Sequence, residues 1–130
     1  MIVVDSSAAV DFLLTRELGP WVEEHLRAAD DIGVPHLLDV EVVGALRRLA
    51  RNGEISELRA EQALADLVDL DVTRYPHLPF MDAMWSLREN LSAYDAAFVA
   101  LAEALGASLV TTDLRIARAP NLPVRVVAPI

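Results

Sequence analysis

Short apolar runs rich in valine and isoleucine alternate along this chain with longer amphipathic or alanine-rich segments, and this alternation limits the fold more than any other feature. The apolar runs have the length of strands, and the segments between them have the periodicity of helices. Strands that alternate with helices are typical of α/β proteins with a parallel sheet. We therefore predict a three-layer α/β/α fold whose central, mostly parallel sheet has about four to five strands.

The order of elements follows from the same pattern. The predicted strands cover residues 2–5, 31–35, 71–76, 107–113 and 124–129. The predicted helices cover residues 6–14, a stretch beginning at Gly19-Pro20, and residues 36–53, 56–70, 79–90 and 92–106, with a helical turn at 114–120. There is no internal repeat, low-complexity stretch or long linker, so residues 1–130 are predicted to form a single domain.

Composition removes several classes of protein. The 130 residues contain no cysteine, which excludes disulfides, thiolate metal sites and cysteine nucleophiles. The N-terminus "MIVVD" lacks the basic start of a signal peptide, and no apolar run approaches the roughly 18 residues of a membrane span. We expect a cytoplasmic protein without membrane contact. The net charge of -9, with arginine as the sole basic residue besides histidine, means that a nucleic acid would need a local arginine patch or a bound cation.

Four acids are predicted to meet at one edge of the sheet. In an open parallel sheet the carboxyl ends of strands and the amino ends of the following helices share the edge where ligands usually bind. Asp5 and Asp113 end predicted strands, while Glu41 and Asp95 lie in the first turns of predicted helices. Other acids fall at the opposite edge or on solvated faces: Asp31, Asp66, Asp69, Asp71 and Glu103. Four more are not sorted by this rule, namely Asp11, Glu17, Asp82 and Asp39, the last predicted as the N-cap of the helix that carries Glu41.

Each of the four acids also has an ordinary structural explanation. Ser92 and Asp95 have capping-box spacing, and the other three could be helix caps or first-turn residues. Together, however, four carboxylates in one cleft would raise one another's pKa, and a divalent cation would relieve that repulsion. Oxygen ligands without cysteine favour Mg²⁺ or Mn²⁺. Zinc is not favoured, because the histidines are scattered without ligand spacing at His25, His36 and His77.

The acidic motifs resemble those of PIN-domain proteins, more narrowly VapC-type toxin ribonucleases of toxin-antitoxin pairs. "IVVDSSAAV" matches the first motif at Asp5, "LLDVEVVGALRRL" the second at Glu41, and "YDAAFVALAEALGASLVTTD" the third and fourth at Asp95 and Asp113. The resemblance extends to the closing "VRVVAP". It implies a Mg²⁺-dependent endoribonuclease that is usually a dimer and is silenced by a small VapB-like antitoxin.

The resemblance implies roles for these acids. Asp5, Asp95 and Asp113 are expected to bind the metal directly or through water, with Glu41 holding the attacking water or a second ion. A coordinated ion lowers the pKa of its water and neutralises charge on the scissile phosphate. The expected product is RNA with a 5′-phosphate. An antitoxin is expected to direct an arginine or lysine towards the metal-binding acids while its apolar residues fill a groove, and the amphipathic segments 20–30 and 56–70 offer apolar surface for it and for a second copy.

RNA contacts are predicted from side chains near the acids. Arg48 lies two turns after Glu41 on nearly the same helix face, and Arg51 follows one turn later. Thr112 is predicted to touch substrate or to position a carboxylate, whereas Ser7 is predicted to serve in capping. For any arginine a surface role is as common, and this holds most for Arg47, Arg88, Arg115 and Arg118. The aromatics near the edge, Tyr94 and Trp85, are predicted to pack in the core.

Other classes fit less well. A phosphoacceptor receiver domain needs a lysine, which the chain lacks, and a haloacid-type phosphatase needs Asp-x-Asp where this chain has Asp5-Ser6-Ser7. No glycine-rich phosphate loop is present. The alternative that stays open is a PIN-like binding module without catalysis.

Overall fold

A parallel sheet forms the centre of the molecule. The computed structural model of the chain describes residues 1–129, and within them five strands pair in the order β3-β2-β1-β4-β5. All neighbouring strands run parallel. The strands are β1 (Ile2–Val4), β2 (Ile32–Pro35), β3 (Thr73–Tyr75), β4 (Ser108–Val110) and β5 (Val126–Val127). The predicted α/β class and mostly parallel sheet are therefore confirmed.

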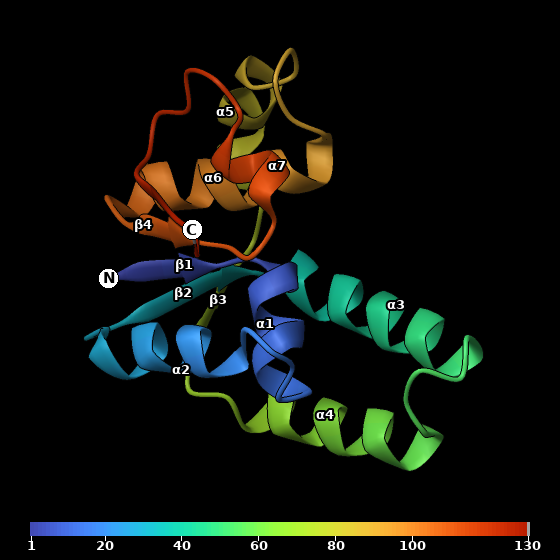
Figure 1. Cartoon of the computed structure of the whole chain (residues 1–130). Coiled ribbons are helices and arrows are strands. Elements are labelled where there is room, and N and C mark those ends of the chain that lie inside the picture. Colours follow the sequence, from blue (N-terminus) through green and yellow to red (C-terminus); the bar gives the residue numbers. More distant parts are fainter. Residues whose placement is uncertain (130) are drawn as a thin grey trace.

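Helices cover both faces of this sheet (Figure 1). The lower side in that view carries the helices α1 (Ser6–Leu13), α2 (Gly19–Ala28), α3 (Leu37–Arg51) and α4 (Glu57–Asp69). The upper side carries the 3₁₀ turn η1 (Leu78–Phe80) and the helices α5 (Met81–Ser86), α6 (Ala93–Leu105) and α7 (Leu114–Ala117). Within residues 1–129, no helix combines the length and apolar character that crossing a membrane requires.

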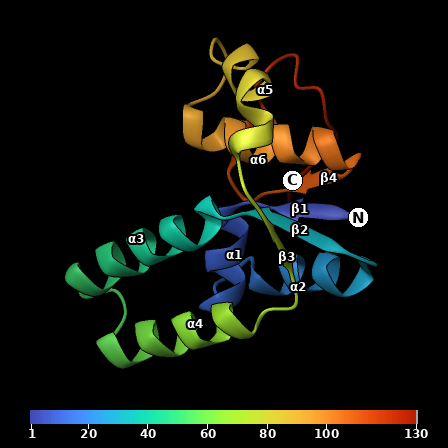
Figure 2. The ribbon, with the colours of Figure 1, turned by 180° about the vertical axis from the view of Figure 1, so that it is seen from behind.

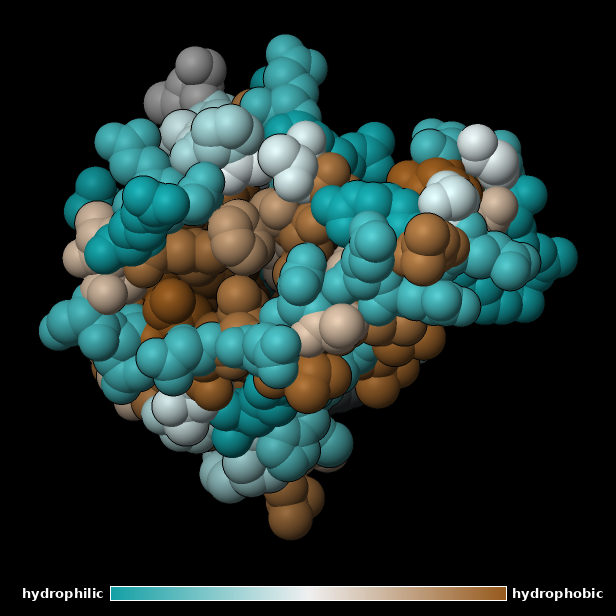
Figure 3. All heavy atoms as spheres, turned by 90° about the horizontal axis from the view of Figure 1, so that it is seen from below, coloured by the Kyte–Doolittle hydropathy of each residue, from teal (hydrophilic) through white to brown (hydrophobic). Residues whose placement is uncertain are grey.

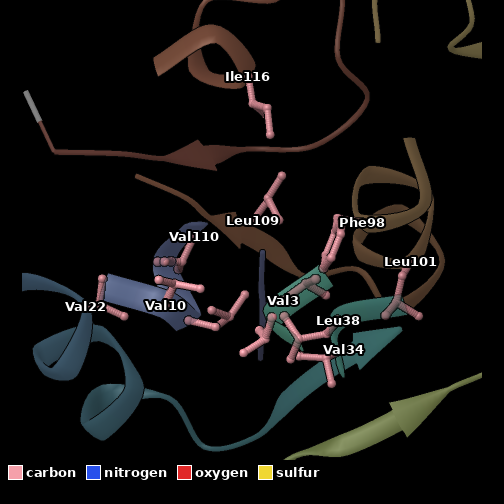
Figure 4. Close-up of a cluster of buried hydrophobic side chains, with 14 of the residues drawn as sticks. Val3, Val10, Val22, Val34, Leu38, Phe98, Leu101, Leu109, Val110 and Ile116 are labelled. Atoms are coloured by element: carbon pink, nitrogen blue, oxygen red, sulfur yellow. The ribbon is translucent and has the colours of Figure 1, made fainter. Parts of the chain in front are cut away.

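The hydrophobic core lies on the two faces of the sheet. Helix α6 packs against β1, β2 and β4, and its residues 96–102 are all buried. Figure 4 shows Phe98 and Leu101 of this helix beside Val3 and Leu109 of the strands. Strands β1 and β4 pair in a register that places Val4 opposite Val110. Burial of apolar side chains on both faces of the sheet favours one register, because a shift by one residue would turn each side chain to the other face. That register places the residues that follow the two strands side by side.

Local signals set the helix ends. Ser56 and Ser92 cap α4 and α6, each accepting a hydrogen bond from the backbone N–H three residues on. Gly106 ends α6 with φ of 63°, a left-handed conformation that glycine adopts without steric cost. One predicted cap is wrong. The N-cap of α3 is His36, and Asp39 lies inside the first turn, where it forms a two-pronged ion pair with Arg74 of β3.

Helices α3 and α4 form a hairpin that extends away from the sheet in both views of the ribbon (Figures 1 and 2). Their buried residues pack the two helices together, while Val40, Val43, Leu58 and Val68 are exposed. The predicted apolar surface is therefore present on residues 56–70, and Figure 3, seen from the side of α1, α2 and α4, shows hydrophobic residues in brown among hydrophilic residues in teal. It is not present on α2, where Val22 is buried and no large hydrophobic residue is exposed among residues 19–28.

Candidate metal centre

Asp5 is the most enclosed acid of the candidate site. It follows β1 directly and caps α1, accepting the Ala8 N–H at 3.0 Å on Oδ1. The Ser7 hydroxyl donates to the same oxygen at 2.7 Å, and the Thr111 hydroxyl donates to Oδ2. Its side chain is only 3% exposed, so these three donors replace water almost completely.

Burial also changes the acidity of Asp5. Desolvation raises its pKa from the ordinary value of 3.8 to about 6, against the lowering effect of the Ala8, Thr111 and Ser7 hydrogen bonds. The negative charge of Asp113 raises it further. A carboxylate that is ionised at neutral pH only at a cost in free energy would gain from a nearby cation.

Glu41 and Asp95 reach the same region from opposite layers. Glu41 lies in α3 and accepts a hydrogen bond from the Ser6 hydroxyl at 3.1 Å. Asp95 lies in the first turn of α6, where its backbone N–H, 3.2 Å from the Ser92 hydroxyl, completes the predicted cap. Desolvation is the main cause that raises the pKa of each, and repulsion adds to it, from Asp95 and Asp5 at Glu41 and from Asp113 at Asp95. The two acids are half-buried and electrostatically coupled.

Asp113 differs from the other three because it has a positive partner. It caps α7 through the Arg115 N–H at 2.9 Å, and the Arg115 guanidinium donates to both carboxylate oxygens, Nε–Oδ1 at 3.2 Å and Nη2–Oδ2 at 2.8 Å. The hydrogen bond from Arg115 is the main cause that lowers the pKa of Asp113. Thr111 links this acid to the first one, since its hydroxyl accepts the Asp113 N–H at 2.9 Å while donating to Asp5.

The four carboxylates therefore form one electrostatic cluster at the carboxyl edge of the sheet, where α1 and α3 begin (Figure 1). Glu41 borders two cavities. One of about 630 Å³ is also lined by Ser6, Ser7 and Arg48, and one of about 430 Å³ by Asp95 and Arg115. Within residues 1–129, no three acid or histidine side chains are close enough together to hold a metal ion.

The acids predicted to lie at the opposite edge or on solvated faces are outside the cluster. Their side chains are exposed, and none of them lines either cavity of the cluster: Asp31, Asp66, Asp69, Asp71 and Glu103. These five acids are therefore solvated and separate from the cavities that Glu41 borders. The histidines do not join the cluster either, since the imidazole of His25 bonds the Trp21 carbonyl while His36 and His77 are exposed caps.

The sequence predicts only some of the contacts that hydroxyl side chains make around Asp5. Ser7 was predicted to cap a helix, but Asp5 is the cap and Ser7 holds its carboxylate. Thr111, fully buried, holds Asp5 from the other side, whereas Thr112 contributes its backbone N–H to Ser7 at 3.2 Å. A substrate contact by the Thr112 side chain stays a prediction. Thr111 and Ser6 were missed, because only the register of β1 and β4 and the packing of α1 on α3 bring them to these acids.

The predicted RNA-binding residues are mostly exposed. Arg48 lines the larger cavity with Glu41, and Arg51 lies exposed at the end of α3. Their role stays a prediction. The prediction that Trp85 and Tyr94 pack in the core is wrong, since they are 68% and 61% exposed. Tyr94 lines the smaller cavity, and the guanidinium carbon of Arg88 lies 4.6 Å from the centre of the Trp85 ring.

The fold and the cluster of acids define a class that comparison with known proteins identifies. The profile of the PIN domain matches residues 2–122, and the chain belongs to the PIN-domain family. Within it, ribonuclease VapC9 of Mycobacterium tuberculosis is 47% identical over 116 residues, which are 89% of this chain and 88% of the relative. Ribonuclease VapC1 of the same species is 46% identical over 122 residues, 93% of this chain and 92% of the relative. The predicted resemblance to VapC proteins is therefore confirmed.

Solved structures show the same fold. VapC20 of Mycobacterium tuberculosis aligns with a TM-score of 0.70 and 16% identity over 96% of this chain and 99% of that one. A chain of the VapBC2 structure from Rickettsia felis, bound to a DNA fragment from its promoter, aligns with a TM-score of 0.70 and 14% identity over the full length of both. At these identities the likeness concerns the α/β/α architecture.

Proposed function

We propose that this protein is a divalent-metal-dependent endoribonuclease of the VapC type, inhibited by a cognate VapB-like antitoxin. The observation that carries the proposal is the cluster of four carboxylates, brought from four separate elements to the carboxyl edge of the sheet. The sequence similarity to ribonucleases VapC9 and VapC1 supports RNA as the substrate.

The donor set fits a hard divalent cation. All candidate ligands are carboxylate oxygens, the chain has no cysteine, and the histidines lie outside the cluster. The pKa values of Asp5, Glu41 and Asp95 are all raised, in part by mutual repulsion, which a cation would relieve. We assign Mg²⁺ or Mn²⁺ to Asp5, Asp95 and Asp113, whose side chains would have to move closer together to bind one ion.

The residues of the chain would divide the work of phosphodiester hydrolysis as follows. Glu41, oriented by Ser6, accepts the proton of the attacking water, a role that suits a carboxylate with a raised pKa. Ser7 and Thr111 hold Asp5 in place for the ion. Arg48 contacts a phosphate of the RNA from the larger cavity. When bound, a divalent cation supplies Lewis acidity that stabilises charge on the phosphate oxygens.

The antitoxin would dock on the α3–α4 hairpin. An apolar cavity of about 300 Å³ between these helices is lined by Val43, Leu64, Leu67 and Val68. The same helix α3 carries Glu41 on a different side from Val43, so a peptide seated there would have to pass around α3 to bring a basic side chain to the acids. Solved chains of the same fold include toxin-antitoxin complexes. Replacing Val43 and Val68 by Asp should abolish capture by the antitoxin but leave RNA cleavage intact, and inhibition that persists would refute this docking site.

A homodimer is the second assembly that we propose. A separate apolar surface around α5 is formed by Leu78, Met81 and Trp85, each more than half exposed. Burying it against a second copy would remove these side chains from water. Light scattering on the purified chain would give the mass of a dimer, and Met81→Asp should give that of a monomer. A monomeric parent chain would refute the proposal.

The function is tested by incubating the purified chain with single-stranded RNA under increasing MgCl₂. Fragments with 5′-phosphates should appear with metal, disappear in excess chelator, and be absent with the Asp5→Asn variant. Asp71→Asn, at the other edge, should cleave like the parent. A chain that binds RNA and metal without cutting would establish the alternative, a binding module without catalysis.

A further inference from the structure

The proposed function does not explain why Arg115 pairs with Asp113. Its guanidinium contacts both oxygens of Asp113, and its backbone N–H contacts Oδ1 as well. Three donors from a single residue thus use three of the roughly four lone-pair positions of that carboxylate. A metal ion that takes Asp113 as a ligand must therefore displace at least part of this pairing.

The side-chain ion pair between Arg115 and Asp113 can break without disturbing helix α7. The side chain of Arg115 is 87% exposed while that of Asp113 is 19% exposed, so water competes for the guanidinium and weakens the ion pair from that side. The N-cap of α7 does not depend on the guanidinium, since the Arg115 backbone N–H makes that contact. The guanidinium can leave Asp113 while α7 stays capped. The pair is therefore separable from the fold.

Once released, the side chain would stay over the site. Arg115 lines the cavity of about 430 Å³ together with Glu41 and Asp95, and within residues 1–129 no other positively charged residue lines it. The negative charge of Asp95 also acts on Arg115. An RNA phosphate that enters this cavity would meet a planar guanidinium that can bind two of its oxygens at once.

Resting on the proposed function, we propose that Arg115 is an exchangeable partner of Asp113: it neutralises this carboxylate in the metal-free chain, yields it to the divalent cation, and then binds the RNA phosphate. Before metal binds, Arg115 thus competes with the ion for Asp113. After metal has bound, Arg115 contacts the RNA phosphate. Loss of the Arg115 side chain should therefore raise the affinity for metal and lower the affinity for RNA. A residue with a purely structural role would not change these two affinities in opposite directions.

The experiment measures the affinity of the full chain for MnCl₂ by calorimetry without RNA, and then RNA cleavage at saturating MnCl₂. Arg115→Gln should bind Mn²⁺ about two- to fivefold more tightly, the range that loss of an exposed ion pair allows. The same variant should lose about tenfold or more in kcat/KM, mainly through a higher KM for RNA. Arg115→Lys, which keeps the charge, should keep the metal affinity of the parent.

The matched control is Arg27→Gln. Arg27 also forms an exposed pair with a carboxylate, Glu23 at 2.6 Å, but at the far end of α2. The Arg27→Gln substitution removes the same charge as Arg115→Gln and should change neither the affinity for Mn²⁺ nor kcat/KM. Unchanged or weaker Mn²⁺ binding by Arg115→Gln, or equal tightening by Arg115→Lys or Arg27→Gln, would overturn the proposal. If the parent binds no Mn²⁺ or cuts no RNA, the proposed function itself fails, whatever Arg115 does.

Discussion

Acidic residues at the two edges of the parallel sheet lie in opposite environments. At the carboxyl edge, Asp5 is 3% exposed and surrounded by hydrogen-bond donors from its own helix and from the strand end beside it. At the amino edge, the side chain of Asp30 is 87% exposed and pairs with the N-terminal amine at 2.9 Å. Burial raises the pKa of Asp5, while the amine lowers that of Asp30.

This difference shows that the acidity of an aspartate depends on its position in the fold and not on its residue type. An exposed acid beside a positive group is stable as an anion, so it has no need of a metal ion. A buried acid beside other acids is costly as an anion, and that cost is what a divalent cation can recover. Among the acids of residues 1–129, those whose pKa is raised are Asp5, Glu41 and Asp95, and all three lie at the carboxyl edge, where ligands usually bind.

The largest expected difference between the edges is in catalysis. Asp95→Asn should reduce Mg²⁺-dependent RNA cleavage at least about 100-fold, because it removes a proposed metal ligand while the Ser92 hydroxyl still accepts its backbone N–H. Asp71→Asn, the matched change at the amino edge, should retain cleavage near that of the parent. Initial rates of fragment formation measure both. Near-parental cleavage by Asp95→Asn would contradict its assignment to the site.

The second difference concerns the pH dependence of stability without metal. The pKa of Asp5 is raised from 3.8 to about 6, so the folded chain binds more protons than the unfolded chain between these values. The free energy of unfolding should therefore fall as pH rises from about 4 to about 6, by about 3 kcal/mol from this group. Asp5→Asn should remove that fall, and urea unfolding in chelator at pH 4 and pH 7 measures it.

Asp30 supplies the control of opposite sign. Its pKa is lowered, so its pairing with the amine stabilises the folded chain above the unfolded pKa, and this contribution is lost as the pH drops through the folded one. Asp30→Asn should therefore lower stability at pH 7 and not at strongly acidic pH. If Asp5→Asn had the same pH profile as Asp30→Asn, the burial of Asp5 would not control its acidity.

Two threonines allow a third comparison. Thr111→Val keeps the shape of a fully buried side chain but leaves Oδ2 of Asp5 and the Asp113 N–H without the partner that Thr111 provides. We expect a loss of about 1–3 kcal/mol in the free energy of unfolding at neutral pH. Thr73→Val, at the exposed start of β3, should stay within about 0.5 kcal/mol. Denaturant midpoints compare the two, and equal effects would mean that Thr111 acts only through packing.

Much of this division was predictable from the sequence. The alternation of strands and helices predicted the parallel sheet, and chain order then predicted which acids share its carboxyl edge. The site also contains contacts that chain order does not encode. Thr111 reaches Asp5 because β4 pairs with β1 in one particular register, and a shift by one residue would turn the hydroxyl to the other face.

The errors have similar physical causes. Asp39 has the chemistry of an N-cap, but α3 begins almost directly after β2, so the acid falls inside the helix and pairs with Arg74 of the next strand. Trp85 and Tyr94 are large aromatic residues of the kind that fill cores, but Trp85 lies on α5, which has no buried residue, and Tyr94 lies in the first turn of α6, before its buried residues 96–102. Neither outcome depends on local sequence. Both depend on which neighbour a helix meets in three dimensions.

The smallest expected difference is in RNA binding by single arginines. Arg48 lines the larger cavity beside Glu41, whereas Arg27 is exposed near the amino edge. Each phosphate contact to a single strand releases counterions, so losing one should reduce the slope of log Kd against log salt by about 0.7. Arg48→Gln should show that reduction in fluorescence anisotropy with RNA in chelator, and Arg27→Gln should not. Since the net charge of -9 repels RNA as a whole, equal slopes for both variants would mean that binding does not depend on a local patch at the carboxyl edge.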